Sequence, residues 1–301
     1  MVNPLISPAE SEYITRGIAE NLRADGRGRN DFRHLVLETG VLANASGSCR
    51  LQIDDTDVLV GVKVDVGDPD ADTPSLGRIE CSVDCAPTIT ANLESAVSLA
   101  DLQLELTQLL ARRFTAASLP MVDFGSLSII AGESCFVLYL DAMVLASGGN
   151  VEDAIFLAAK AALATTVIPA IELVDLADGS QDYELVDDPS RARAFPGAED
   201  LPLCVTVSQI GHRFVLDASV AEEHVASSRV HVFTARDGRV AHMQMAGHGG
   251  VDPTLLREMT AAARQAAIAL HEKLALALER ERAEARANKR KDGPLKWGFL
   301  A

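Results

Sequence analysis

Residues 135–166 read CFVLYLDAMVLASGGNVEDAIFLAAKAALATT. The opening apolar run is typical of a buried strand, and beyond the glycine pair the apolar residues recur at helical spacing. The stretch therefore predicts a strand over 134–145, a tight turn, and a helix that reaches Val167 and is stopped by Pro169. Many proteins hold a phosphate in this way, because backbone N–H groups and the positive end of the helix dipole face the anion.

The residues of the turn argue against a bound anion. Asn150 is expected to cap the helix, while Glu152 and Asp153 occupy its first turn. Carboxylates in this position already satisfy the positive end of the dipole, and they would repel a phosphate at close range. The first basic residue after the turn is Lys160. On these grounds we predict a capped helix start that binds no phosphate.

Upstream of this stretch, the pattern alternates between helices and strands. The sequence SPAE (7–10) is a capping box with proline at the first helical position, and it predicts a helix over 8–22. A second helix is expected over 93–114, where leucines recur at helical spacing. Strands are expected at 35–42, 48–54, 58–66, 78–86 and 126–131, with a hairpin at the DDTD turn.

Downstream, a segment over 170–201, with short strands and a turn-rich stretch, separates this pattern from a second one. Strands are expected at 203–210, 212–219, 229–235 and 239–245, followed by a long helix from about Asp252. Two consecutive groups of strands, each followed by a helix, indicate an α+β fold built from two similar halves. We place these halves at residues 1–170 and 171–301.

The composition argues against some classes of function. The chain has 301 residues and a net charge of −16, and it contains no apolar run long enough to span a membrane. So acidic a surface repels polyanions at long range. A protein that binds nucleic acid without partner subunits usually carries an excess of basic residues. Any contact with RNA must therefore come from a local group of arginines or from partner subunits.

Motifs of metal, nucleotide and hydrolase chemistry are missing. The sequence contains no HExxH, GxSxG or GxxxxGK[ST] motif. His242 and His248 are the nearest pair of histidines, and no carboxylate or cysteine lies at ligand spacing beside them. We therefore expect no metal site and no cofactor. The acidic residues Asp217, Glu222 and Glu223 are interpreted as the solvated start of a helix.

Several separated motifs, in the same order, resemble those of a known family. RADGRGRNDFR (23–33) and ASGSCRLQIDDTDVLVGVKVDV (45–66) resemble the opening of RNase PH-like proteins. GRIECSVDCAP (77–87), the stretch over 135–163, DDPS (187–190) and DASVAEEHVASSRV (217–230) resemble one branch, the RNase PH-like ring subunits of the eukaryotic RNA exosome. The resemblance covers about residues 8–301.

This resemblance implies a fold, an assembly and a set of partners. The fold would be two RNase PH halves, the second like domain 2 of ribosomal protein S5. The chain would be one of six such subunits in a ring that single-stranded RNA threads, with S1/KH cap subunits and associated exoribonucleases as further partners. It would support 3′–5′ processing and degradation of RNA, including rRNA maturation and mRNA turnover, in the nucleus, nucleolus and cytoplasm, with no membrane association.

The chain departs from the pattern of the family's active members. They degrade RNA by phosphorolysis, with an Asp-Gly-Gly-Ser/Thr-Arg loop that seats phosphate and an acidic residue in a Gly-x-Ala-Asp stretch. Here the loop reads SGGNV (147–151) and the second stretch reads VASSR (225–229). The resemblance therefore implies a non-catalytic structural subunit, with no catalytic residues. The alternative, an active phosphate-dependent 3′–5′ exoribonuclease, would need a substitute cation and acid near the loop, and neither is visible in the sequence.

Arginines are the remaining candidates for contact with RNA. Related subunits have RNA-facing basic residues at the end of the second helix, which here carries Arg112 and Arg113. The same pair could instead stabilise the C-terminus of its helix through the dipole, and both interpretations stay open. Arg27 and Arg33 also match family positions, and we expect them to brace the N-terminal turn.

Overall fold

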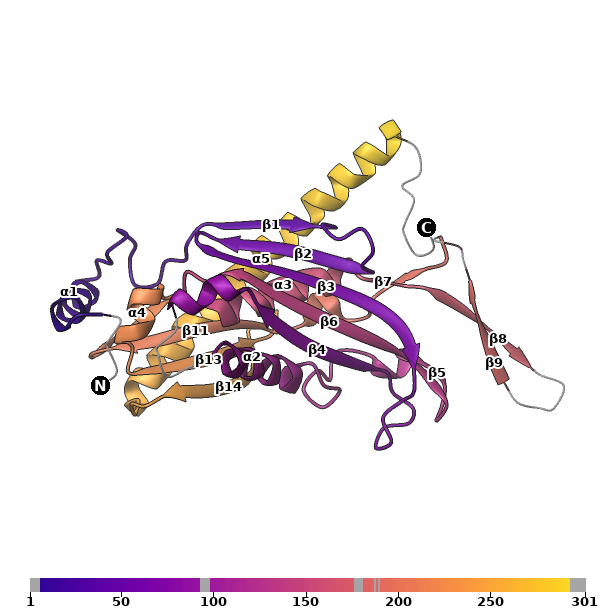
Figure 1. The fold of residues 1–301 in the computed structure, drawn as a ribbon, viewed down its shortest axis with the longest axis horizontal. Coiled ribbons are helices and arrows are strands. Elements are labelled where there is room, and N and C mark those ends of the chain that lie inside the picture. Colours follow the sequence, from indigo (N-terminus) through magenta and orange to yellow (C-terminus); the bar gives the residue numbers. More distant parts are fainter. Residues whose placement is uncertain (1–5, 93–97, 176–180, 187, 189, 293–301) are drawn as a thin grey trace.

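The fold, seen in a computed structural model, contains two main β-sheets (Figure 1). The structure describes residues 6–92, 98–175, 181–186, 188 and 190–292. The first sheet has the strand order β1 (Leu35–Thr39), β2 (Gly47–Ile53), β3 (Thr56–Gly67), β6 (Ser134–Ala146) and β4 (Arg78–Cys85), and β5 (Ser128–Ile130) pairs with β6. Neighbouring strands of this sheet are antiparallel, except that β4 runs parallel to β6.

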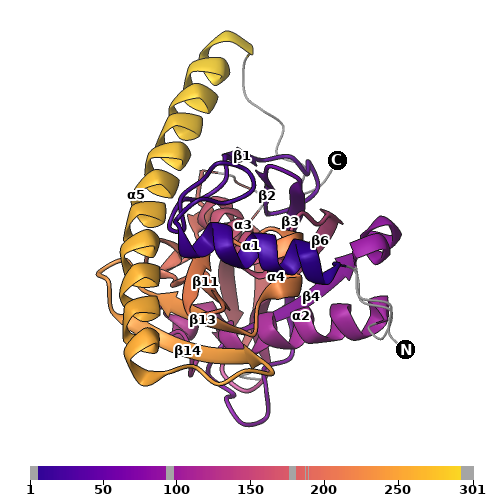
Figure 2. The ribbon, with the colours of Figure 1, turned by 90° about the vertical axis from the view of Figure 1, so that its left-hand side faces the viewer.

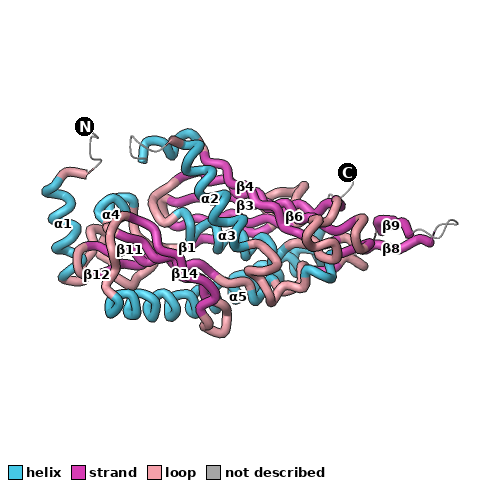
Figure 3. Tube along the Cα trace, turned by 90° about the horizontal axis from the view of Figure 1, so that it is seen from below, coloured by secondary structure: helices cyan, strands magenta, loops and turns pink. Residues whose placement is uncertain are grey.

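The second sheet is smaller and antiparallel throughout. Its order is β12 (Arg213–Leu216), β11 (Leu203–Ile210), β13 (Ser228–Thr234) and β14 (Val240–Gly247). Two short two-stranded sheets connect or extend the body: β7 (Val167–Ile168) pairs with β10 (Arg193–Ala194), and β8 (Ala170–Asp175) pairs with β9 (Gln181–Val186). The β8–β9 hairpin projects from the end of the molecule opposite α1 (Pro8–Ala19), as Figures 1 and 3 show.

The helices are distributed over both sheets. Helix α2 (Leu99–Arg113) packs on β4, and the long helix α5 (Pro253–Asp292) packs on β11 and β13 and continues past them (Figure 2). The short helix α4 (Val220–Val225) lies between β12 and β13 in the chain. Three 3₁₀ turns complete the elements of the described residues: η1 (Pro87–Asn92), η2 (Phe124–Leu127) and η3 (Ala198–Asp200). No helix among the described residues is long and apolar enough to cross a membrane.

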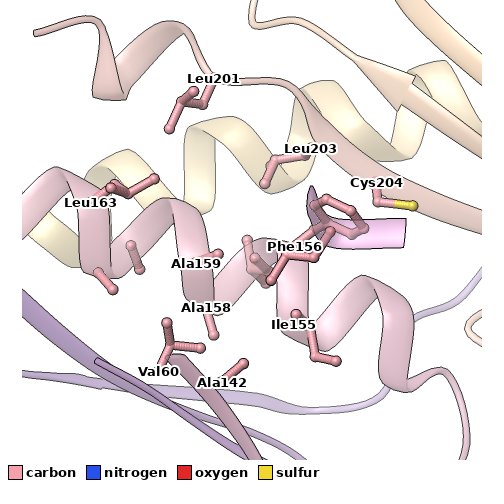
Figure 4. Close-up of a cluster of buried hydrophobic side chains, with 14 of the residues drawn as sticks. Val60, Ala142, Ile155, Phe156, Ala158, Ala159, Leu163, Leu201, Leu203 and Cys204 are labelled. Atoms are coloured by element: carbon pink, nitrogen blue, oxygen red, sulfur yellow. The ribbon is translucent and has the colours of Figure 1, made fainter. Parts of the chain in front are cut away.

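Helix α3 (Val151–Thr165) forms the centre of the molecule, because it lies between the two sheets. In Figure 4, Val60 and Ala142 of the first sheet lie on one side of the helix, and Leu203 and Cys204 lie on the other. Every residue from 153 to 164 is buried, and the many alanines allow both sheets to approach closely. The turn before α3 is therefore fixed at the junction of the two halves.

Most expected elements are confirmed, including the α+β class, the two halves, the DDTD hairpin and the capping box of the first helix. Helix α1 ends at Ala19 rather than at residue 22, because Asn21 adopts a left-handed φ of 61° and the Leu22 N–H bonds back to the Gly17 carbonyl. Helix α3 ends at Thr165, two residues early, because residues 167–168 pair with β10.

The second helix and the expected boundary between the halves need separate comment. Helix α2 begins at Leu99 with Ser98 as its cap, and residues 93–97 of the expected helix lie outside the described residues. The division at 170/171 stays a prediction. Strands β7 and β10 pair across it, so the two segments are joined by backbone hydrogen bonds as well as by α3.

Candidate functional site

The turn between β6 and α3 is held in a backbone conformation that requires glycine. Gly149 has a φ of +98°, and a Cβ atom at this position would lie 2.6 Å from the carbonyl oxygen of Ala218. A larger residue would therefore be strained and would also collide with the second half of the chain. The glycine pair thus brings the start of α3 against the segment that leads into α4.

The expected side-chain cap of α3 is wrong. Asn150 occupies the cap position, but its φ of 56° is left-handed and its side chain makes no cap hydrogen bond. A side-chain cap normally needs extended backbone at this position. The Nδ2 atom of Asn150 instead donates to the Asp153 and Asp217 carboxylates, at 3.0 Å each. The residue therefore ties the helix start to the second half.

A carboxylate of the chain itself occupies the place where an anion would bind. The backbone N–H of Asn150 donates to Oε1 of Glu223 at 2.8 Å. Glu223 lies on α4, which begins with a capping box formed by Ser219 and Glu222. The N–H of Gly148 is also engaged, with Oγ1 of Thr56 at 3.0 Å. Two amides that a phosphate could use are therefore already bound to side chains.

The carbonyl groups of the turn face an arginine. Arg33 donates to the Gly148 and Gly149 carbonyl oxygens at 2.9 Å each and forms a two-pronged ion pair with Asp217. Both charged side chains of the pair are buried. Burial by itself would raise the pKa of Asp217, but the hydrogen bonds and charge of Arg33 outweigh it and lower the pKa. Asp217 therefore stays ionised and holds Arg33 in place.

Asp217 and Glu222, after β12, are buried partners of the N-terminal arginines, so the interpretation of these acidic residues as a solvated helix start is wrong. Arg23 pairs with Glu222, and both side chains are almost fully buried. Arg27 donates to Asp217 at 3.0 Å, beside Arg33. The expected bracing of the N-terminal turn is confirmed for Arg27, which donates to Asp25 and to the Asp31 carbonyl oxygen, whereas the Arg33 side chain braces the turn before α3. The sequence did not reveal this network, because its two sides lie almost 200 residues apart.

The expectation of no cation and no acid near the loop is also wrong, because the fold brings both from distant segments. Besides Arg33, the guanidinium of Arg229 lies 3.4 Å from Glu152 and 3.8 Å from Glu223. Burial raises the pKa of Glu223 to about 7, helped by the charge of Glu152. The charge of Glu152 raises the pKa of Arg229. These cations are thus paired with carboxylates around the turn.

Asp153 anchors the first turn of α3 to the second sheet. Its carboxylate accepts from the N–H of Thr206 at 2.8 Å and lies 2.6 Å from the Thr206 hydroxyl, which in turn lies 2.9 Å from Nδ1 of His231. Burial is the largest effect on Asp153 and raises its pKa to about 7. Lys160 lies further along α3 and points away from the turn, toward the Glu199 and Leu201 carbonyl oxygens.

The structure separates the two candidate RNA-contacting arginines. Arg112 is exposed and lines a cleft of about 270 Å³ between α2 and the second sheet, together with Glu152 and Arg229. Arg113 turns into the protein, where Nη2 donates to Gln244 at 2.8 Å and the guanidinium lies 4.8 Å from the centre of the Phe233 ring. Contact of either residue with RNA stays a prediction, and of the two only Arg112 faces this cleft.

Two family models match the chain, one for each half. The 3′ exoribonuclease family, domain 1, matches residues 31–169, and domain 2 of the same family matches residues 200–266. The chain therefore belongs to this family, whose domains carry the RNase PH name.

Within the family, the chain is similar to exosome components. It is 32% identical to the exosome complex component Rrp42 of Methanocella arvoryzae, over 91% of this chain and 98% of that protein. It is 29% identical to the putative exosome complex exonuclease RRP42 of Dictyostelium discoideum, over 84% of this chain and 92% of that protein. The resemblance to exosome subunits that the motifs indicate is confirmed.

Solved structures give the same relationship. An archaeal exosome core chain superimposes with a TM-score of 0.72 at 29% identity, over 88% of this chain and 96% of that one. The Archaeoglobus fulgidus exosome with RNA bound to the active site gives a TM-score of 0.74, also at 29% identity, over 88% of this chain and 97% of that one. The two-domain exosome fold therefore extends over most of the chain.

Proposed function

We propose that this chain is a non-catalytic structural subunit of an exosome core ring, which supports 3′–5′ processing and degradation of RNA in the nucleus, nucleolus and cytoplasm. The relatives named as exosome components and the similar exosome structures support the assembly. Other RNase PH-like subunits would be its neighbours, with S1/KH subunits and exoribonucleases attached to the ring.

The Glu223 carboxylate on the Asn150 amide is the observation that carries the non-catalytic assignment. Phosphorolysis needs inorganic phosphate at the start of this helix, where free N–H groups and a cation would hold it. A phosphate would have to displace Glu223 and would still lie near the carboxylate of Glu152. Arg33 cannot take the missing arginine's place, since it is buried against Asp217 and the turn's carbonyl oxygens.

RNA would contact this subunit only inside the assembly, and Arg112 would provide the contact. A single exposed arginine on a chain of net charge −16 does not attract RNA alone, but it adds to the arginines of neighbouring subunits along a shared path. Such a contact is made to the phosphate backbone. It should therefore show no sequence preference and should weaken strongly with salt.

RNA degradation by the purified chain tests this proposal. The chain alone and a ring rebuilt from it and its RNase PH-like partners are each incubated with single-stranded RNA, with and without inorganic phosphate. We expect no release of nucleoside diphosphates by the chain alone, and protection of threaded RNA only when the partners are present. Phosphate-dependent release of nucleoside diphosphates by the chain alone would contradict the non-catalytic assignment, and failure to assemble would contradict the structural one.

A further inference from the structure

The β8–β9 hairpin has an apolar face that the body of the molecule leaves largely uncovered. Ile171 pairs with Leu185, and Leu173 pairs with Tyr183. Side chains alternate along a strand, so these four residues lie on the same face. Ile171 packs against the hydrophobic core at the base of the hairpin, but Leu173 and Leu185 are 52% and 55% exposed. The apolar face therefore runs from the core out into solvent.

An isolated two-stranded sheet is only marginally stable in water. A hairpin with an exposed apolar face is therefore stabilised when another surface covers that face. Two arginines that follow the hairpin in the chain fix the orientation of its base. Arg191 pairs with Glu172, and Arg193 donates to the carbonyl oxygen of Ser126. The arm is thus fixed at its base and projects beyond the first sheet, as Figure 1 shows.

The opposite face of the hairpin is acidic. Glu172 stands directly opposite Glu184, and Asp182 stands opposite Val174. Like charges in such a cross-strand pair are destabilising unless a cation is near, and Arg191 supplies only one. Over residues 170–190 the sequence has seven acidic residues and no lysine or arginine. The hairpin segment therefore carries a strong net negative charge.

The charge of the arm decides what kind of molecule can cover its apolar face. RNA would be repelled by the acidic face, and so would a second copy of this chain, whose net charge is −16. Charged side chains on strand edges also disfavour pairing with a further strand. What fits is the surface of another protein, with an apolar groove for Leu173 and Leu185 and a rim of lysine or arginine.

We infer that the β8–β9 hairpin is a docking arm that binds a basic, RNA-binding subunit of the same assembly. Subunits that bind RNA carry the basic surface that the arm requires. This inference rests on the proposed function, because it places the partner on the exosome ring. Leu173 and Leu185 are the apolar anchors, and the opposite face, with Glu184 and Asp182, attracts the partner's basic surface through its negative charge.

The test uses rings rebuilt from the full chain and its RNase PH-like partners, with purified S1/KH subunits as the probe. Leu173→Ser combined with Leu185→Ser removes the anchors, and Glu184→Lys reverses one charge of the acidic face. Leu276→Ser is the matched apolar control, since Leu276 is also 55% exposed but lies on α5, and Glu258→Lys is the charge control on the same helix. Ring assembly is followed by light scattering, and binding of each labelled S1/KH subunit by fluorescence anisotropy.

We expect all four variants to form rings. The two arm variants should bind one S1/KH subunit at least about tenfold more weakly, whereas the two controls should bind it like the wild type. Intact rings with unchanged affinity for every S1/KH subunit would overturn the docking arm and leave the proposed function standing. Loss of ring assembly in the arm variants alone would assign the arm to an RNase PH-like neighbour and overturn our choice of partner. A wild-type chain that forms no ring would overturn both proposals.

Discussion

Glu223 is the residue on which the proposed absence of a phosphate at the turn most directly depends. The residue lies 73 positions from the turn in sequence, and yet its carboxylate accepts the hydrogen bond that an anion would accept at the start of α3. Its burial raises its pKa to about 7. Because this pKa lies near neutral pH, the free energy of unfolding should depend on pH in this range.

The pH dependence of unfolding should reveal this carboxyl group. Because its pKa is higher in the folded chain than in the unfolded chain, Glu223 takes up a proton on folding between about pH 4.5 and pH 7. Its contribution to stability is complete below this range and is lost as the pH rises through it. In Glu223→Gln this loss is absent. As the pH rises from 5 to 8, the free energy of unfolding of the variant should therefore increase by on the order of 2 kcal/mol relative to that of the wild type.

Denaturant unfolding of both proteins across this pH range measures the difference. Asp153 also has a pKa of about 7, but it titrates in both proteins and cancels when they are compared. Glu258→Gln, a change at an exposed residue of α5, serves as the control and should leave the pH profile unchanged. Parallel profiles for Glu223→Gln and the wild type would show that Glu223 is ionised in the folded chain throughout.

At the scale of elements, helix α2 ends in two arginines with different surroundings. Arg112 faces the cleft beside Arg229, and Arg113 packs between Gln244 and the Phe233 ring. We therefore expect Arg112→Ala to leave stability unchanged, to weaken RNA binding by the assembled ring and to lower the slope of log K against log salt by about one. Arg113→Ala should instead destabilise the chain by about 1–2 kcal/mol.

Salt-dependent RNA titrations of the ring and urea unfolding of the chain measure these two effects. Each variant serves as the control for the other, because the residues are neighbours on one helix. If Arg113→Ala changed the salt dependence and Arg112→Ala did not, the assignment of the RNA contact would be reversed. If neither variant changed the salt dependence, the remaining interpretation would be that the two arginines stabilise the C-terminus of α2 through the helix dipole.

Local patterns predicted the elements well, and they failed where the outcome depends on distant contacts. The strand, turn and helix over 134–165 follow from hydrophobic periodicity and a glycine pair, which are properties of neighbouring residues. Helix α4, with six residues, is too short to show a helical period, and only its start was inferred, from the acidic residues beside it. The left-handed backbone of Asn150 could not be predicted either, because contacts with the second half hold its side chain.

The candidate site was predicted only in part, for a similar reason. That no phosphate binds at the turn stays a prediction, and it was inferred from Glu152 and Asp153, which are local. In the structure Glu223 accepts a hydrogen bond from the amide at the helix start, and the cations Arg33 and Arg229 come from distant segments before and after the turn. A sequence pattern does not show which residues lie together in space, so it cannot show which carboxylate pairs with which arginine.

At the scale of the whole molecule, the two halves share one central element. Helix α3 follows the first sheet in the chain, but the second sheet covers it as well, and Asp153 and Asn150 bond it to Thr206 and Asp217. The buried pair of Arg33 and Asp217 adds a further link. Neither half could expose α3 without losing part of its own core, so the halves are not independent folding units.

The chain should therefore unfold in a single transition, and a change in α3 should affect both halves together. Ala159 is fully buried, so Ala159→Leu overpacks the core between the sheets and should lower the melting temperature by a few degrees. Hydrogen exchange of amides in β3 and β11, measured along a denaturant series, should show the same midpoint for both strands. Ala261→Leu, at an exposed position of α5, should leave that midpoint unchanged. Separate midpoints for the two strands would mean that α3 stays with one half while the other unfolds, and the ion pairs at the turn would then join two domains rather than one cooperative body.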